Sequence, residues 1–190
     1  EEGGIVKQDR LTDAVVGGEY TLMAPWQNGI KASYNIPTAS GAHSRLTRWH
    51  YGNIRSCNEI IEILNNATFD AATVKVQIAE AKFLRAWMYY DMAKRYGGMP
   101  LELTAKSVDA PAEELMIPRN TLKETYDQII SDLDASIADL PGVVIYGKAS
   151  KWAAFALKSR VSLYAARIAK YHPQSSNGLT SIPSGDAGAY

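Results

Sequence analysis

Hydrophobic positions are densest between Ile78 and Tyr96, and their spacing predicts a long helix at the centre of the fold. At about 100° per residue, the apolar side chains cover roughly 220° of its circumference, far more than the ~100° stripe of a surface helix. Such a helix needs neighbours on at least two sides. We therefore expect it to pack against the first and fourth helices of the chain, with four buried residues: Ala81, Ala86, Tyr89 and Ala93.

Two charged residues, Lys82 and Arg85, fall inside this apolar arc. A buried charge needs a partner, so their positions predict specific polar contacts. Gly97 and Gly98 follow the helix and predict a left-handed ending, and Pro100 prevents the helix from resuming.

Three further helices are predicted from apolar spacing and from residues typical of helix ends. The first is expected from Leu46 to Asn65, and Asp70 is expected to cap the central helix that follows. Thr121 and Glu124 have the spacing of a capping box at the start of the third helix. Ser150 is expected to cap the fourth.

The remaining segments have no strong period. Residues 1–44 form an irregular N-terminal segment, because glycine and proline interrupt every apolar run. Within it, Leu11–Val16 favours a helical turn and Glu19–Met23 a short strand. Residues 97–118 are predicted to be a long connection, and residues 172–190 a surface loop that leads into a further helix.

An internal repeat underlies the helices. A shift of 75 residues places Arg85 on Arg160 and Tyr89 on Tyr164. The same shift also aligns three other pairs: Ala79 with Ala154, Ala81 with Ala156, and Tyr96 with Tyr171. Repeated hairpins that each close on the next are typical of helical repeat proteins. The pattern therefore predicts an all-α fold of two stacked tetratricopeptide-like helix hairpins over residues 45–171.

The composition excludes several classes of function. Twenty basic residues balance twenty acidic ones, so no charge excess indicates nucleic acid or an anionic membrane as a partner. A single cysteine excludes an internal disulfide framework. No segment has the length and hydrophobicity of a membrane helix or the pattern of a signal peptide. Because the chain begins at Glu1 without a methionine, we expect it to be part of a longer protein.

Motifs for catalysis or cofactor binding are missing from the sequence, so neither an enzyme nor a cofactor is indicated. His43, His50 and His172 do not have metal-ligand spacing and are expected at the surface or in loops. Cys57 lies on the apolar side of the first helix, which predicts a buried, inert thiol rather than a nucleophile.

Two pairs of charged residues have a functional and a structural interpretation. Asp132 and Asp134 lie two apart on a helix and so point in different directions, which favours a solvated face over an acid–base pair. Arg85 and Arg160 are either ligand-binding arginines or parts of structural ion pairs that hold the hairpins together. We expect each arginine to meet a carboxylate or a set of backbone carbonyls.

The N-terminal segment contains the residues best suited to bind a ligand. Trp26 and Tyr34 lie among amide side chains, including Asn28 and Asn35. An aromatic ring can stack on the apolar face of a sugar while nearby amides bond its hydroxyl groups. These four residues are therefore candidate ligand-binding residues. The alternative is that the rings only anchor their loops to the core.

Four stretches of the sequence resemble the helical core of SusD/RagB-type proteins. They are, in order, WHYGNIRSCN (Trp49–Asn58), AEAKFLRAWMYYDMAKRYGGMPL (Ala79–Leu101), IPRNTLKETYDQIISDLDASIADLP (Ile117–Pro141) and KASKWAAFALKSRVSLYAARIAKY (Lys148–Tyr171). Ala189 and Tyr190 are similar to the beginning of that family's next helix. Before Arg45 the resemblance is weak.

This resemblance implies a surface-exposed lipoprotein of a Bacteroidetes-type outer membrane with a tetratricopeptide-like scaffold. Such proteins cap a SusC-like TonB-dependent transporter and bind oligosaccharides or peptides for import without cleaving them. The chain departs from the family pattern by lacking the acylated N-terminal cysteine, which Cys57 cannot replace, and the C-terminal part. The matching residues, with Gly97 and Gly98 among them, are scaffold residues, so no ligand contact is transferred. A helical-repeat adaptor that binds a protein partner is the alternative.

Overall fold

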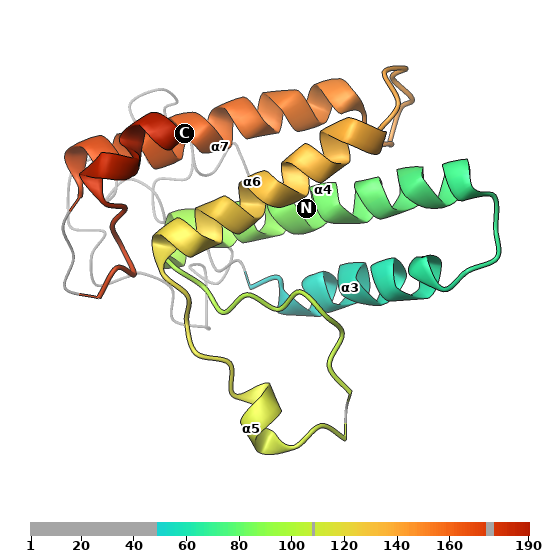
Figure 1. The fold of residues 1–190 in the computed structure, drawn as a ribbon, viewed down its shortest axis with the longest axis horizontal. Helices are drawn as coiled ribbons and strands as arrows, with labels where there is room; N and C mark the ends of the chain where they lie inside the picture. The colour runs from blue at the N-terminus through green and yellow to red at the C-terminus, as the bar shows by residue number, and fades with distance from the viewer. Residues whose placement is uncertain (1–48, 108, 174–176) are drawn as a thin grey trace, which may run out of the picture. The chain divides into compact units, whose positions relative to one another are not determined.

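The computed structural model describes residues 49–107, 109–173 and 177–190. The chain divides into two compact units, 1–49 and 50–190, and the described helices belong to the second unit. This unit consists of two helix hairpins, and no strand occurs among its described residues (Figure 1). The hairpins are formed by α3 (Tyr51–Asn65) with α4 (Ala71–Tyr96), and by α6 (Leu122–Asp139) with α7 (Lys151–Tyr171). The predicted all-α fold class is confirmed.

The helices begin at the residues that the sequence marks as caps. The Asp70 carboxylate accepts a hydrogen bond from the Thr73 backbone N–H at the start of α4. Thr121 and Glu124 form both bonds of a capping box at α6. Ser150 caps α7 in the same manner as Asp70 caps α4. Each cap satisfies an N–H group that has no partner within its own helix.

The first described helix begins later than predicted. It starts at Tyr51, whereas the sequence pattern placed Trp49 and His50 within the helix. His50 is held outside it by contacts with α4, because its backbone N–H donates to the Met92 sulfur and its ring lies against Asp91. These tertiary contacts override the local apolar spacing. Residues 46–48 lie outside the described part of the chain.

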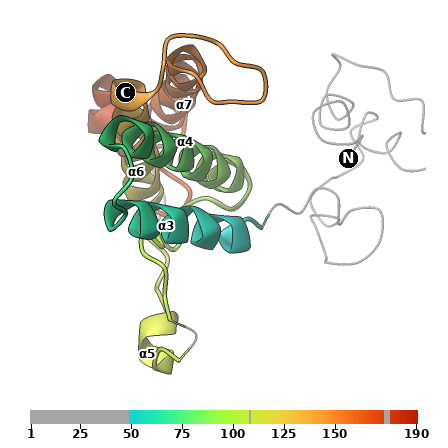
Figure 2. The same cartoon turned by 90° about the vertical axis from the view of Figure 1, so that its right-hand side faces the viewer.

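Helix α4 lies between α3 on one side and α6 and α7 on the other (Figures 1 and 2). The four residues predicted to be buried, Ala81, Ala86, Tyr89 and Ala93, are at most 4% exposed. The two helices that pack against α4 were predicted only in part. Helix α4 contacts α3 as expected, but its main partner on the other side is α6, and it touches α7 only slightly.

The long connection between the hairpins contains a short helix, α5 (Ala112–Leu115), which the sequence did not predict. This helix stands away from the bundle in Figures 1 and 2. The first part of the connection is fixed to the bundle. The Tyr89 hydroxyl contacts both the N–H and the carbonyl of Glu102, and Asn120 accepts a bond from the N–H of Leu101.

The described residues after α7 form a loop that also packs against the helices at one point. Ile182 is completely buried, and Ser184–Ala189 form a 3-10 helix, η3. The Leu179 carbonyl accepts from the N–H of Gly98 at 2.7 Å, and the Gly178 carbonyl accepts from the N–H of Leu122 at 2.9 Å. This contact has a clear physical reason, since these carbonyls satisfy N–H groups at the end of α4 and the start of α6.

Candidate functional site

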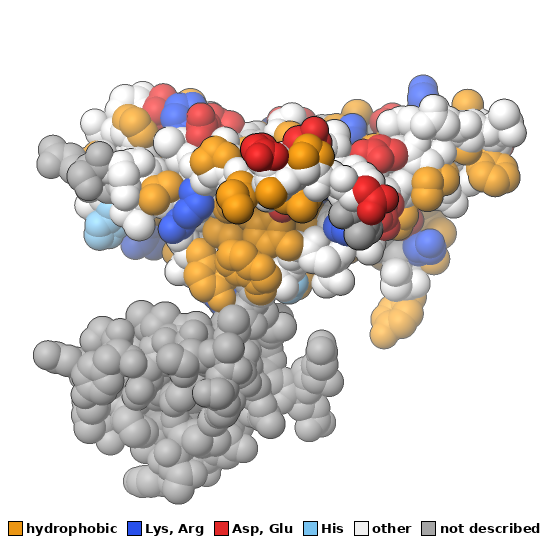
Figure 3. Space-filling view, turned by 90° about the horizontal axis from the view of Figure 1, so that it is seen from below, with side chains coloured by type: hydrophobic (Ala, Val, Ile, Leu, Met, Phe, Trp, Pro, Cys, Tyr) orange, Lys and Arg blue, Asp and Glu red, His pale blue; other side chains and the backbone are white. Residues whose placement is uncertain are grey.

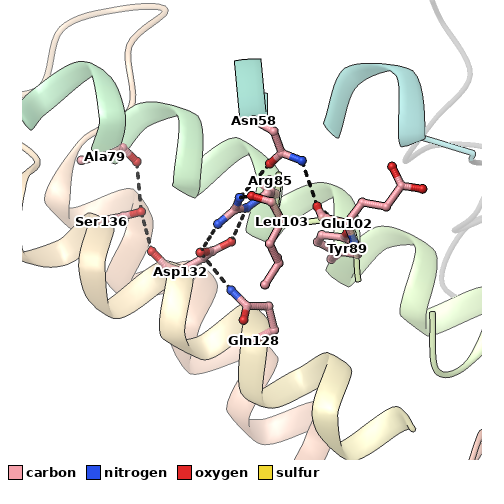
Figure 4. Close-up of polar contacts among 9 residues, drawn as sticks. All are labelled: Asn58, Ala79, Arg85, Tyr89, Glu102, Leu103, Gln128, Asp132 and Ser136. Carbon is pink, nitrogen blue, oxygen red and sulfur yellow. Dashed lines mark hydrogen bonds and ion pairs between the residues drawn. The ribbon is translucent and has the colours of Figure 1, made fainter. Parts of the chain in front are cut away.

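The most buried polar cluster of the described unit surrounds Arg85, in the middle of α4 (Figure 4). Only 5% of Arg85 is exposed. Its Nε and Nη2 atoms lie 2.8 and 2.7 Å from the two carboxylate oxygens of Asp132 on α6. Its Nη1 donates to the side-chain oxygen of Asn58 on α3 at 2.7 Å and to the Leu103 carbonyl at 3.2 Å. Arg85 therefore joins α3, α4, α6 and the long connection at one point.

The partners of Arg85 are themselves held in place. Asp132 accepts a further bond from the Gln128 amide, and the Asn58 amide donates to the Glu102 carbonyl. Burial disfavours the charged guanidinium, but hydrogen bonding and the charge of Asp132 outweigh burial and raise the pKa of Arg85. Because the guanidinium is enclosed and directed at protein oxygens, this geometry favours a structural ion pair over a ligand-binding arginine.

Two expectations about charged residues need correction. Asp132, expected on a solvated face, is only 3% exposed, whereas Asp134 is exposed as expected and pairs with Lys158. Arg160 was expected to meet a carboxylate or carbonyls as Arg85 does. It is exposed and makes no hydrogen bond or ion pair with any residue that the structure describes. The reason is that α6 packs against the part of α4 that holds Arg85, whereas Arg160 lies on α7 at a position that is exposed in the described structure.

A second charged cluster joins the start of α3 to α4. The Nε2 atom of His50 lies 3.2 Å from the Asp91 carboxylate, which also accepts from Arg95 at 2.6 Å. His50 is half-buried and lies in the loop just before α3, which agrees with the expectation of a surface or loop residue. His172 is exposed as expected, and His43 lies outside the described residues. Among the described residues, no cluster of three metal-binding side chains occurs.

Cys57 and Lys82 both lie near Arg85 in the sequence pattern of the helices but have simpler surroundings. Cys57 is 4% exposed, and burial raises the pKa of its thiol, with Arg85 opposing this effect. A thiol that stays protonated is a weak nucleophile, so packing accounts for this cysteine. Lys82 is half-buried and makes no ion pair with a described residue, in contrast to Arg85 three residues later.

Three tyrosine rings meet where α4, α6 and α7 approach one another. Tyr90 makes edge contacts with Tyr126 and Tyr164, and the last two rings are stacked. Tyr126 is completely buried, and its hydroxyl has no hydrogen-bond partner among the described residues. Burial and the neighbouring tyrosines raise its pKa, so the hydroxyl stays neutral. A buried hydroxyl without a partner lowers stability.

We therefore expect Tyr126→Phe to raise the free energy of unfolding by about 1 kcal/mol, because it removes an unsatisfied polar atom and keeps the ring. Tyr89→Phe is the matched control. It removes a hydroxyl that bonds to Glu102, and it should lower stability by about 1–2 kcal/mol. Urea denaturation measures both. Equal losses of stability in the two variants would contradict the assignment.

Two surface hollows flank the N-terminal half of α4. One, of about 390 Å³, lies against the α6–α7 connection, and the other, of about 380 Å³, lies against α3. They share Gln77, Glu80 and Lys148. Glu80 accepts a bond from the Ala149 N–H and lies 3.6 Å from the Lys148 ammonium group.

The walls of these hollows are aliphatic. Ile60, Ile63 and Leu84 line one of them, and Val143 and Ile145 line the other. Neither has a described aromatic residue in its lining, so neither offers a ring for a sugar to stack on. The hollows therefore do not have the chemistry expected of a sugar site.

Hydrophobic side chains are also exposed outside the hollows, and Figure 3 shows a group of them near the middle of one face.

The four candidate ligand-binding residues, Trp26, Asn28, Tyr34 and Asn35, lie outside the described residues. What the structure describes is the scaffold that the helices form.

Sequence reasoning missed the role of Asp132, although a signal was present. This residue lies three positions after Ile129 and next to Leu133, and both of these residues are completely buried. A carboxylate on an apolar stripe requires a partner for the same reason as Arg85 does.

Comparison with known proteins identifies the family of this scaffold. The model of a SusD-like family, described as starch-binding and associating with the outer membrane, matches residues 9–163. The chain belongs to the SusD-like family. The predicted resemblance is thereby confirmed over most of the sequence.

Individual relatives support the same family. The SusD-like chain is 26% identical to a SusD-like protein of Bacteroides ovatus over 147 residues, which are 75% of this chain and 26% of that protein. A solved SusD-like protein from Bacteroides fragilis is 35% identical, with a TM-score of 0.61 over 70% of this chain and 26% of its own. A structure solved with xylogluco-oligosaccharide is 25% identical, with a TM-score of 0.58 over 75% of this chain and 28% of its own.

The SusD-like chain is much shorter than these relatives. It spans about a quarter of the length of these relatives. The family includes carbohydrate-binding proteins, one of them described as binding laminarin. That relative is 22% identical and so supports the fold alone. In the described part of the SusD-like chain, no helix has the length and hydrophobicity needed to cross a membrane.

Proposed function

We propose that this chain is the helical scaffold portion of a non-catalytic glycan-binding subunit of an outer-membrane import complex. In this complex it acts as a surface lipoprotein beside a SusC-like TonB-dependent transporter. The ligand is an oligosaccharide, with a peptide as the less favoured choice. The observation that carries the proposal is the family match over residues 9–163, supported by a helical fold shared with a relative solved with xylogluco-oligosaccharide.

The described residues support a scaffold role for the helices. The buried charge of Arg85 is occupied by protein atoms, and the hollows beside α4 have aliphatic walls. Neither provides the ring and amides that a sugar needs. We therefore place the contribution of this chain to the glycan site in the N-terminal segment, at Trp26, Asn28, Tyr34 and Asn35.

The experiment that tests the function uses the full-length protein. Affinity gels that contain xyloglucan, laminarin or starch should retard its migration for at least one polysaccharide, while a gel with no polysaccharide does not. Purification from solubilised outer membranes should also recover a TonB-dependent transporter. If no polysaccharide retards the protein in gels and no glycan of a broad array binds it, the glycan-binding proposal is contradicted. If the purification recovers a different protein partner in place of the transporter, the adaptor alternative is supported.

Trp26→Ala in the full-length protein is expected to weaken glycan binding some thirtyfold. The reason is that losing a stacking ring at a binding hot spot costs about 2 kcal/mol or more. Isothermal titration with the polysaccharide identified in the gels measures the effect. Trp152→Ala is the matched control, because it removes an exposed indole from α7 and should leave the affinity unchanged. Wild-type affinity in a folded Trp26→Ala protein would favour the anchoring role for this ring.

A further inference from the structure

The loop after α7 contains an asparagine that is followed directly by a glycine, Asn177 and Gly178. Asn177 is exposed, and its side-chain oxygen accepts a hydrogen bond from the backbone N–H of Leu179 at 3.1 Å. This bond folds the side chain back over the peptide bond between residues 177 and 178. The amide carbon of the side chain is thereby directed toward the backbone nitrogen of Gly178.

This arrangement suits an intramolecular attack on the side-chain amide. The nitrogen of Gly178 loses its proton to hydroxide and bonds to the amide carbon of Asn177. The amide group takes a proton from water and leaves as ammonia, so that a cyclic imide remains. Water then adds to one carbonyl carbon of the imide and opens the ring. The product is aspartate, or isoaspartate, in which the backbone continues through the former side chain.

Two features of the loop favour this attack. Glycine has no Cβ, so its nitrogen is unhindered, and Gly178 adopts a φ of 66° that other residues rarely reach. The hydrogen bond from Leu179 also polarises the side-chain carbonyl of Asn177, which makes its carbon a better electrophile. The loop therefore combines an accessible amide, a close nucleophile and a polarising donor.

Gly178 lies where the loop holds the two hairpins together. Its carbonyl accepts from the N–H of Leu122 at the start of α6, and the next carbonyl, of Leu179, accepts from the N–H of Gly98 at the end of α4. The space around Gly178 is narrow, since a Cβ there would lie 3.2 Å from the Cγ2 atom of Thr121. Isoaspartate would lengthen the backbone by one carbon directly before Gly178. This change would displace both carbonyls from their donors.

We propose that Asn177 with Gly178 is a site of spontaneous deamidation, and that the isoaspartate product loosens the contact of this loop with the ends of α4 and α6. The substrate is the side-chain amide of the chain itself, and water is the co-reactant. The reaction needs no enzyme and gives the folded protein an intrinsic chemical lifetime. The sequence contains another Asn–Gly pair, Asn28 with Gly29, which lies outside the described residues.

Peptide mapping of the full-length protein after incubation in mildly alkaline buffer tests the site. Mass spectrometry and methylation by an isoaspartyl methyltransferase measure the product. Isoaspartate should accumulate roughly tenfold faster at position 177 than at Asn66, because glycine leaves the attacking nitrogen unhindered. Asn66 is the matched control, since it is also exposed, but Ala67 follows it and its amide nitrogen donates to the Glu62 carbonyl at 2.9 Å.

Two further results are expected at this site. The rate should rise with pH, because the attack requires the deprotonated nitrogen of Gly178. Asn177→Ser keeps an oxygen that can accept from Leu179 but has no amide, so it should abolish the modification. Equal rates at positions 177 and 66, or an intact amide at position 177 throughout the incubation, would overturn the proposed site.

The effect on the helices is measured on the modified protein. Ion-exchange chromatography isolates the deamidated form, and methylation gives its isoaspartate content. Its Tm should fall by several degrees in proportion to that content. Asn177→Asp is the matched control, because it has the same charge with a regular backbone and should melt close to the wild-type protein. Equal Tm values for the isoaspartate form and Asn177→Asp would contradict the loosening. None of these outcomes depends on glycan binding.

Discussion

Arg85→Ala is expected to lower the free energy of unfolding by about 3–5 kcal/mol. The substitution leaves the carboxylate of Asp132, which is 3% exposed, without its bidentate partner in a buried site. It also removes a donor from the side-chain oxygen of Asn58 and from the Leu103 carbonyl. The large effect arises mainly from the uncompensated charge that remains and less from the intrinsic strength of the ion pair.

Urea denaturation monitored by helical circular dichroism measures this loss. A double variant, Arg85→Met with Asp132→Leu, should recover much of the stability, because it removes both charges and keeps apolar volume in the site. Lys75→Ala removes an exposed cation from the same helix and should change stability by less than about 0.5 kcal/mol. A loss below about 1 kcal/mol for Arg85→Ala would show that the pair does not hold the hairpins together.

Gly98→Ala is expected to cost about 2–4 kcal/mol, because the added methyl group has no space. A Cβ atom at Gly98 would lie 2.1 Å from the Asn120 carbonyl oxygen and 2.8 Å from the Leu122 nitrogen. Both are backbone atoms and cannot move aside as a flexible side chain does. The end of α4 and the start of α6 would have to separate. At Gly97 a Cβ would lie 2.2 Å from the Leu179 carbonyl oxygen, and the φ of 79° is a conformation that other residues rarely adopt.

Gly52→Ala is the matched control for Gly98→Ala. Gly52 lies in α3, and a Cβ there has no other atom within 4 Å. Alanine has the higher helix propensity, so this variant should gain about 0.5–1 kcal/mol. Thermal denaturation compares the effect of the same added methyl group at Gly98, where backbone atoms leave no space, and at Gly52, where space is free. Similar melting temperatures would show that the close approach at Gly98 tolerates a side chain.

The parts of the fold that local chemistry determines were predictable from the sequence. Asp70, Thr121 and Ser150 each cap the helix they were expected to cap, because their bonds involve neighbours in the sequence. The central position of α4 followed from the width of its apolar arc. The start of α3 at Tyr51 was not predictable in this way, because it depends on contacts with α4, which is distant in the sequence.

The candidate site was less predictable than the fold. The sequence indicates that Arg85 needs a partner, but only the structure identifies Asp132, which is 47 residues away and was expected in solvent. The repeat suggested that Arg160 would have the same environment. The repeat determines which side chains are present on α7, whereas their burial depends on which elements pack against that helix. The glycan site at Trp26 and its neighbours stays a prediction.

The buried segment around Ile182 has a consequence for the dynamics of the helical unit. The N–H groups of Gly98 and Leu122 donate to the carbonyls of Leu179 and Gly178. Neither amide can exchange its hydrogen with solvent until this C-terminal segment moves away. Both amides should therefore show slow exchange and become exposed in the same opening event. Residues on either side of the long connection thus belong to one cooperative unit, closed by a segment that follows both hairpins.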